Sequence, residues 1–158
     1  MKNEYIIYKR DVCKISNIIP NYYKDTDYYL LNPITDDSLT IKIPVNNKEI
    51  RPLLTRAEVD NIIKNIPSIM PLNDSSNKLE NTYKELLATN KHEDLVKIIK
   101  TTYLRNKERL DNNKKTTDKD TYYFNLAEKY LYTEFSVVLN LSYEETKEYI
   151  INTLTNLS

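Results

Sequence analysis

The most restrictive feature of this 158-residue chain is that it contains no glycine. Glycine is the residue that adopts left-handed backbone conformations without a steric penalty. Gly-rich phosphate-binding loops, dinucleotide-binding turns and nucleophile elbows all depend on such backbone positions. The sequence therefore excludes these nucleotide-binding and hydrolase motifs, and its turns are marked by clusters of Asp, Asn and Pro instead.

Residues that could bind a structural metal are scarce. The chain has one His and one Cys, which is too few for a zinc site of ordinary composition. His92-Glu93 begins like the helix of a zinc protease, but the residue four positions after His92 is Val96. The sequence predicts no metal and no cofactor. It also predicts that Cys13 is a small buried hydrophobic residue rather than a reactive thiol.

Candidate catalytic groups are equally few. Asp36-Asp37 and Glu144-Glu145 are adjacent carboxylates, and sequence neighbours point apart on a strand or a helix. Turn and helix-capping chemistry explains both pairs. His92 stands at the start of a helical segment, where we expect it to close a turn rather than to act as a base. Because no pair of nucleophile and base can be named, we predict no catalytic residues and no enzymatic activity.

The first 54 residues have the pattern of short β-strands. Candidate strands are residues 5–8, 12–18, 27–31 and 39–45. In the last of these, Thr40, Lys42 and Pro44 alternate with three apolar residues. A period of two with one apolar face is typical of a half-buried strand. Four or five short strands in this length predict a strongly bent sheet or a small barrel with a small core.

After residue 54 the pattern becomes helical. Thr55–Glu58 and Ser142–Glu145 are capping boxes, and Thr117–Asp120 is an approximate one. Stripes of apolar residues at helical spacing predict five helices. The fourth, which begins near Thr117, has apolar residues on more than one face, so we expect it to be central. The sequence therefore predicts an α+β protein of two parts, residues 1–54 and 55–158.

The apolar residues are distributed as in a protein that has a core and no membrane anchor. Hydrophobic residues make up 40% of the chain, and Tyr alone supplies 14 residues. Tyr can stack on nucleic-acid bases, but most of these residues lie on apolar stripes, so we expect them mainly in the core. No apolar run approaches the ~20 residues that a membrane span requires. We therefore expect a cytoplasmic protein with no membrane association.

Charge is balanced overall, with 23 basic and 23 acidic side chains, but it is uneven along the chain. Residues 97–115 contain seven basic residues against Glu108 and Asp111, whereas the remainder from residue 116 carries three basic and seven acidic side chains. The basic segment is either a solvated helix face and turn or a patch that faces phosphates. Zero net charge argues against indiscriminate binding to nucleic acid, so any contact with DNA would be local or assisted.

Four segments of the chain together carry a family resemblance. D-D-S-L-T-I-K-I-P-V-N-N at 36–47 precedes I-R-P-L-L-T-R-A-E-V at 50–59, and two more segments lie at 87–109 and 127–134. Their order resembles that of the CarD/CdnL family of bacterial transcription regulators. The first two segments look like its L-T-I-x-V-P-V and R-P-L-x-S patterns. The later two are similar to L-x-S-G-D, V-A-E-V-V-R-D-L and R-R-D-x-E-R, and to A-R-x-L-L-x-x-E-L-A.

The resemblance implies an N-terminal Tudor- or SH3-like β-barrel that binds the β subunit of RNA polymerase, and a C-terminal five-helix domain that contacts promoter DNA. The protein would be a monomeric transcription factor that modulates the stability of the promoter open complex. Lys42 matches a basic position that the family uses toward the β subunit. The polymerase-binding residues expected on this basis are Leu39, Thr40, Lys42 and Pro44. The expected DNA-binding residues are Lys78, Lys84, Arg105, Lys114 and Lys115.

The chain departs from the family pattern at three places. The family's V-Y-P-x-H-G-V-G becomes I-Y-K-R-D-V-C at 7–13, without glycine, and its S-G-D turn becomes T-N-K-H-E-D at 89–94. The family's Trp, which wedges into the minor groove, has no counterpart because the chain has no Trp. An alternative function therefore stays open, in which the protein binds polymerase or another partner without a functional contact with DNA.

Overall fold

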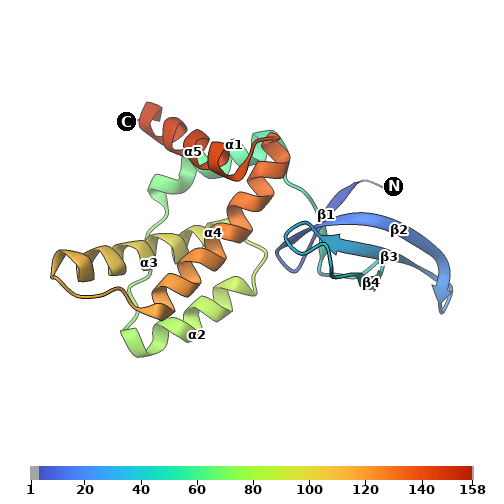
Figure 1. Ribbon diagram of the computed structural model, residues 1–158, viewed down its shortest axis with the longest axis horizontal. Helices are drawn as coiled ribbons and strands as arrows, with labels where there is room; N and C mark the ends of the chain where they lie inside the picture. Colours follow the sequence, from blue (N-terminus) through green and yellow to red (C-terminus); the bar gives the residue numbers. More distant parts are fainter. Residues whose placement is uncertain (1–3, 158) are drawn as a thin grey trace. The chain divides into compact units, whose positions relative to one another are not determined.

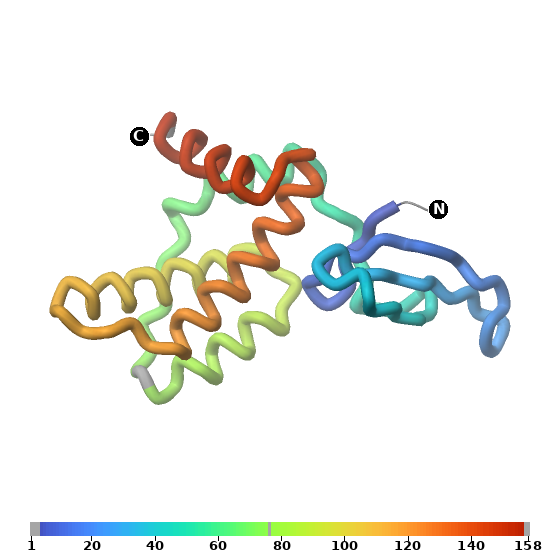
Figure 2. The backbone as a smooth tube through the Cα atoms, viewed as in Figure 1, coloured from blue at the N-terminus to red at the C-terminus, as the bar shows by residue number. Residues whose placement is uncertain are grey.

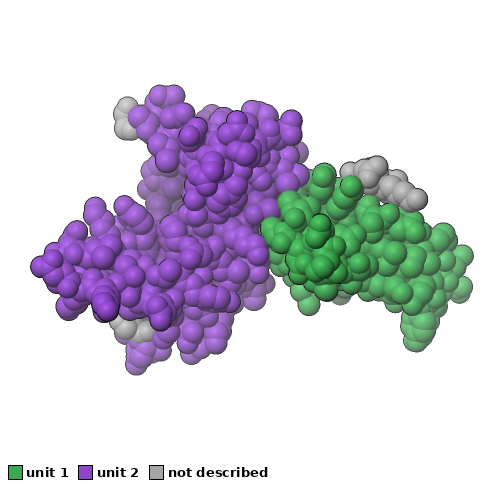
Figure 3. Space-filling model, viewed as in Figure 1, with its two compact units in different colours: residues 1–54 green, residues 55–158 purple. Residues whose placement is uncertain are grey.

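The computed structural model describes residues 4–157, except for the side chains of Ser76 and Leu157. The structure is a mixed α+β fold, in which five antiparallel strands are followed by five α-helices (Figure 1). The predicted α+β class and the predicted number of helices are confirmed. The chain divides into two compact units, residues 1–54 and 55–158, which Figure 3 draws in different colours.

The five strands of the first unit form one antiparallel sheet. Their order is β4-β3-β2-β1-β5, so β4 and β5 are its two edges. The sheet is open, because β4 and β5 do not pair with each other in the described residues. The barrel that the resemblance implies is therefore not confirmed. The strands are β1 (Tyr5–Tyr8), β2 (Asp11–Tyr23), β3 (Thr26–Pro33), β4 (Ile41–Pro44) and β5 (Ile50–Pro52).

One face of this sheet carries the core of the first unit. Cys13, Ile15, Leu31 and Ile43 are buried together on it. Burial, with a smaller contribution from Asp11, raises the pKa of the Cys13 thiol to about 12. The prediction that Cys13 is a small buried hydrophobic residue is confirmed, since a thiol with so high a pKa is rarely a reactive thiolate.

The hairpin turns of this unit use charged residues where glycine is usual. Lys9 and Arg10 join β1 to β2 with φ values of 49° and 77°. Lys24 and Asp25 join β2 to β3, at the end of the long hairpin in Figure 2, with φ values of 50° and 58°. Positive φ at both central residues belongs to the turn that matches the twist of the flanking strands, which Asn-Gly adopts most easily. Non-glycine residues pay roughly 1–2 kcal/mol each in this conformation.

Replacing Lys24 by Asn and Asp25 by Gly is expected to stabilise the protein by about 1 kcal/mol, because the turn is then built from the favoured dipeptide. Both native residues are exposed, so no packing is lost. Urea unfolding followed by circular dichroism measures the effect. Asn46→Gly is the matched control, since Asn46 is exposed without a positive φ and glycine there should destabilise. A double variant no more stable than the native chain would contradict the prediction.

The second unit begins at a helix cap. The Thr55 hydroxyl accepts a hydrogen bond from the Glu58 amide at 3.1 Å, and the Glu58 carboxylate accepts one from the Thr55 amide at 2.9 Å. Ser142 and Glu145 make the same pair of bonds, at 3.1 and 2.9 Å. Both predicted capping boxes are confirmed, and these bonds lower the pKa of Glu58 and of Glu145. The helices are α1 (Arg56–Asn65), the short 3₁₀ turn η1 (Ile66–Ser68), α2 (Ser76–Leu87), α3 (His92–Asp111), α4 (Asp118–Leu139) and α5 (Tyr143–Leu157).

Helix α4 is the centre of this unit. It packs against α1, α2, α3 and α5. Its residues Tyr123, Ala127, Leu131, Phe135 and Leu139 are buried. The prediction of a central fourth helix is therefore confirmed, and the apolar residues on several of its faces are explained by the helices around it.

Candidate partner-binding and nucleic-acid interface

The edge strand β4 is the first candidate site. It pairs with β3 on one side, and as an edge strand it presents backbone groups on the other. The predicted strand at 39–45 is too long, since β4 covers Ile41–Pro44. Leu39 and Thr40 are exposed and lie before the strand, where the Asn32 amide donates to the Leu39 carbonyl at 2.9 Å and to the Thr40 hydroxyl at 3.1 Å. These side-chain bonds replace strand pairing there.

Lys42 projects from β4 on the face opposite the buried Ile43. Its Nζ atom donates to the Tyr22 hydroxyl at 3.0 Å and lies 4.4 Å from the centre of the Tyr22 ring. The Tyr22 ring in turn packs at 5.0 Å from that of Tyr28. We call Lys42, Tyr22 and Tyr28 the Lys42 cluster. A cation–π contact at an exposed site contributes about 0.5–1 kcal/mol, so the ammonium group is held in place rather than fully mobile.

The distribution of tyrosines differs from the expectation. Tyr83 and Tyr123 are buried, as predicted. The expectation is wrong for five tyrosines that are exposed among the described residues, and several others are half-buried. Pro20 and Asn21 precede Tyr22 in a strand without regular alternation, which is the signal that this part of β2 lies outside the core. The exposed tyrosines are Tyr5, Tyr22, Tyr23, Tyr103 and Tyr122.

The basic residues predicted to contact DNA fall into three settings. Lys78 and Lys84 are exposed on α2. Lys114 and Lys115 are exposed in the loop between α3 and α4. Arg105 is partly buried on α3, where its Nε atom lies 3.0 Å from the carboxylate of Asp120. Four of the five residues are therefore available to a partner, whereas Arg105 already has an internal one.

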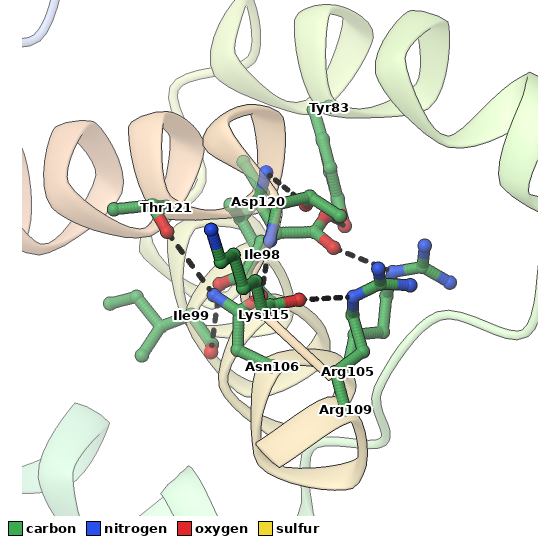
Figure 4. Close-up of polar contacts among 11 residues, drawn as sticks. Tyr83, Ile98, Ile99, Arg105, Asn106, Arg109, Lys115, Asp120 and Thr121 are labelled. Atoms are coloured by element: carbon green, nitrogen blue, oxygen red, sulfur yellow. Dashed lines mark hydrogen bonds and ion pairs between the residues drawn. The ribbon is translucent and has the colours of Figure 1, made fainter. Parts of the chain in front are cut away.

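Asp120 is a residue whose role could not be seen in the sequence. Its carboxylate is 2% exposed, and it accepts hydrogen bonds from Arg105 Nε at 3.0 Å and from the Tyr83 hydroxyl at 3.1 Å (Figure 4). Burial raises the pKa of Tyr83, and the neighbouring Asp120 charge raises it further. One carboxylate therefore ties α2, α3 and α4 together.

The approximate capping box at Thr117–Asp120 is only half formed. The Thr117 hydroxyl accepts a hydrogen bond from the Asp120 amide at 3.1 Å, as predicted. The Asp120 carboxylate does not complete the box, because it is turned toward Arg105 and Tyr83. The partners lie 15 and 37 residues away, beyond the reach of a local sequence pattern.

The end of α3 positions a second arginine. The Asn113 amide donates to the Leu110 carbonyl at 3.1 Å and the Lys114 amide to the Arg109 carbonyl at 2.8 Å, with Asn113 at φ 59°. This is the Schellman ending, here with Asn where Gly is usual. The chain then reverses, so that the Lys115 carbonyl accepts a hydrogen bond from Arg109 Nε at 2.7 Å.

Two neighbouring hollows share Arg105 and Arg109 in their lining. One has a volume of about 200 Å³ and the other about 300 Å³. We call the first, smaller one the arginine hollow. It is lined by Arg105, Glu108, Arg109, Asn112 and Lys114. Four cationic or amide side chains and one carboxylate therefore face a concave surface at the end of α3.

His92 has a different role from the one expected. Its Nε2 atom lies 2.8 Å from the Glu134 carboxylate, and both side chains are almost fully buried. The pair joins the start of α3 to α4 across 42 residues of sequence. His92 also borders a third hollow, of about 400 Å³, with residues of α1 and η1. The contact to α4 gives His92 a structural partner that the turn hypothesis did not include.

Other features of the chain give no second indication of function. Within residues 4–157, no helix is both long and apolar enough to cross a membrane. In the same part of the chain, no three His, Cys, Asp or Glu side chains are grouped so that they could hold a metal ion. No model of a known protein family and no curated protein matches the chain. The Lys42 cluster and the arginine hollow are therefore the features from which a function can be argued.

Proposed function

We propose that this protein is a transcription regulator of the CarD/CdnL type, which binds the β subunit of bacterial RNA polymerase and contacts promoter DNA. It acts as a cytoplasmic monomer without catalytic activity and modulates the stability of the open complex. The observation that carries the proposal is the Lys42 cluster on the edge strand β4. Lys42 is the residue that the resemblance at 36–47 assigns to the β subunit. A sheet followed by five helices agrees with the implied order of domains.

Strand addition explains how β4 would bind polymerase. An edge strand offers main-chain donors and acceptors to a partner strand, which supplies affinity, while outward side chains supply selectivity. Leu39 and Thr40 are exposed beside this edge, and Pro44 ends the strand without an amide hydrogen. A partner strand with an acidic residue opposite Lys42 fits these features. The Tudor- or SH3-like closure of the sheet is part of this proposal and is not needed for strand addition.

The second unit would contact DNA through its exposed lysines. Lys78, Lys84, Lys114 and Lys115 are all exposed. Contacts to phosphate position a protein on DNA without reading its sequence. The zero net charge of the chain makes such contacts weak without polymerase. We therefore expect DNA binding to be strong only within the promoter complex.

Replacing Lys114 and Lys115 by Ala is expected to flatten the salt dependence of promoter-complex binding. Each lost phosphate contact should remove about one unit from the slope of log affinity against log salt. The measurement is a titration of polymerase–promoter complexes at several salt concentrations. Lys129→Ala is the control, because Lys129 is exposed on α4, outside the basic segment. If the double variant has the native slope, this loop is merely solvent-facing.

The alternative without a functional DNA contact is favoured by one observation at α2. Residues 73–77 before and at its start are polar, and the nearest aromatic side chain, Tyr83, is 0% exposed with its hydroxyl bound to Asp120. Tyr83 therefore cannot wedge between base pairs, and prising a base step apart costs a few kcal/mol that an inserted apolar side chain normally offsets. The two functions differ in whether promoter binding with polymerase responds to the lysines above.

Replacing Ser75 by Trp is expected to lengthen the open-complex lifetime, because it supplies the missing wedge. Ser75 is exposed before α2, and its side chain does not cap the helix, so the fold should tolerate the change. A competitor-challenge assay measures the lifetime, with Ser75→Ala as the control. The native chain should prolong open complexes less than a Trp-bearing relative does. Equal lifetimes for both, with no gain in the Trp variant, would mean that another residue does the wedging.

A further inference from the structure

We propose that the arginine hollow binds one phosphate group of the DNA backbone between the guanidinium groups of Arg105 and Arg109. The inference rests on the proposed function for its ligand, promoter DNA. It adds the position of one phosphate and the residues that hold it. Neither Arg109 nor Glu108 was among the residues expected to act on DNA.

The first argument is that both guanidinium groups are fixed in place from behind. Arg105 donates through Nε to the buried Asp120 carboxylate at 3.0 Å, and Arg109 donates through Nε to the Lys115 carbonyl at 2.7 Å. The remaining nitrogen atoms of both groups make no hydrogen bond within residues 4–157. Figure 4 shows the two groups next to each other. Two terminal forks are therefore pre-organised, and a bidentate fork is the geometry that suits phosphate oxygens.

The second argument is electrostatic. Arg105 and Arg109 are one helical turn apart on α3, a spacing at which like charges repel. Asp120 balances Arg105, but Arg109 and Lys114 have no ion pair in the described residues. Glu108 is the one carboxylate that lines the hollow, and it is exposed. An anion between the two arginines would relieve their repulsion, so the hollow favours a negatively charged ligand.

The third argument comes from the absence of glycine in the chain. Glycine-rich loops hold phosphates with backbone amides, and this chain cannot form one. Phosphate recognition must therefore use side chains. Arginines anchored by a buried carboxylate and a backbone carbonyl meet that requirement.

Nuclear magnetic resonance of the full-length ¹⁵N-labelled protein tests the proposal directly. The probes are a short DNA duplex and, separately, inorganic phosphate. Addition of the duplex should shift the Nε–H resonances of Arg105 and Arg109 together. Unmoved arginine resonances at a duplex concentration that shifts other residues would overturn the proposal. A shift with inorganic phosphate and none with the duplex would also overturn it, because the ligand would then be a free anion.

Two variants with opposite expected effects separate this site from general charge. Arg109→Gln should weaken duplex binding by about tenfold, as for the loss of a charge-assisted hydrogen bond. Glu108→Gln should strengthen binding, because it removes the one carboxylate at the hollow. Lys129→Gln is the matched control for loss of a surface charge elsewhere on the unit. Equal affinities of all three variants, with native circular dichroism spectra, would contradict the assignment.

Binding to polymerase is measured in parallel with the same variants. Arg109→Gln should bind the isolated β subunit as the native chain does, since the expected polymerase contact lies on β4. If the duplex shifts the arginine resonances but no variant or native chain binds polymerase, the hollow stands and the proposed function fails. If polymerase binds but the arginine resonances do not respond to DNA, the hollow fails and the proposed polymerase contact stands.

Discussion

Replacing Asp120 with Ala is expected to lower the free energy of unfolding by about 3 kcal/mol, because it leaves a partly buried charge and a buried hydroxyl without their acceptor. Asp120 is 2% exposed and accepts hydrogen bonds from Arg105 and Tyr83. Tyr83 is 0% exposed, so its hydroxyl cannot turn to water instead. Urea unfolding measured by circular dichroism gives the change. It is the largest effect on stability expected for a single substitution of a polar residue in this unit.

A matched carboxylate provides the control for this experiment. Asp118 also lies in the first turn of α4, but it is exposed. Asp118→Ala should therefore cost only the favourable interaction with the helix dipole, about 0.3–1 kcal/mol. Adding Arg105→Met to Asp120→Ala should recover part of the loss, since the unpaired charge is then removed. If Asp118→Ala and Asp120→Ala are equally destabilising, Asp120 does not organise the three helices.

Replacing Lys42 with Glu is expected to weaken binding to the isolated β lobe of RNA polymerase several-fold. The substitution reverses a charge that Tyr22 holds on the edge strand, at 3.0 Å from its hydroxyl. Like charges placed opposite each other in an interface are unfavourable, so an acidic partner surface would be repelled. A titration with the purified β lobe measures the affinity. Because Lys42 is exposed, the fold should remain intact in this variant.

Charge reversal elsewhere on the same sheet distinguishes a local contact from a change in net charge. Lys14 is exposed on β2, which lies inside the sheet rather than at its edge. Lys14→Glu should therefore bind the β lobe nearly as well as the native chain. Unchanged affinity in Lys42→Glu, or an equal loss in both variants, would remove Lys42 from the interface.

The helices were predictable because their signals are local. The hydroxyl–carboxylate pairs at Thr55–Glu58 and Ser142–Glu145 lie three residues apart, and each makes the two bonds that its pattern predicts. The strands were predicted less well. Strand β2 continues to Tyr23, beyond the predicted end at residue 18, through two register shifts that break the alternation of side chains. A bulge moves every later side chain to the other face, so a period of two cannot be followed through it.

The contacts that organise the candidate site were not predictable, since they join residues far apart in sequence. Asp120 looked like a helix cap until its partners at Tyr83 and Arg105 were known. His92 looked like a turn residue, and its contact with Glu134 spans 42 positions. Lys42, in contrast, could be chosen from the alternation in its strand, but Tyr22 beside it could not, because it comes from another strand 20 residues away.

The most direct test of the central claim is the lifetime of promoter open complexes in a competitor challenge, with the chain at saturating concentration. The native chain should lengthen the lifetime relative to polymerase alone, and Lys42→Glu should return it to the value of polymerase alone while Lys14→Glu does not. The claim would be contradicted by a native chain that leaves the lifetime unchanged and is not retained by polymerase. It would also be contradicted by a change in lifetime that is the same in all three proteins.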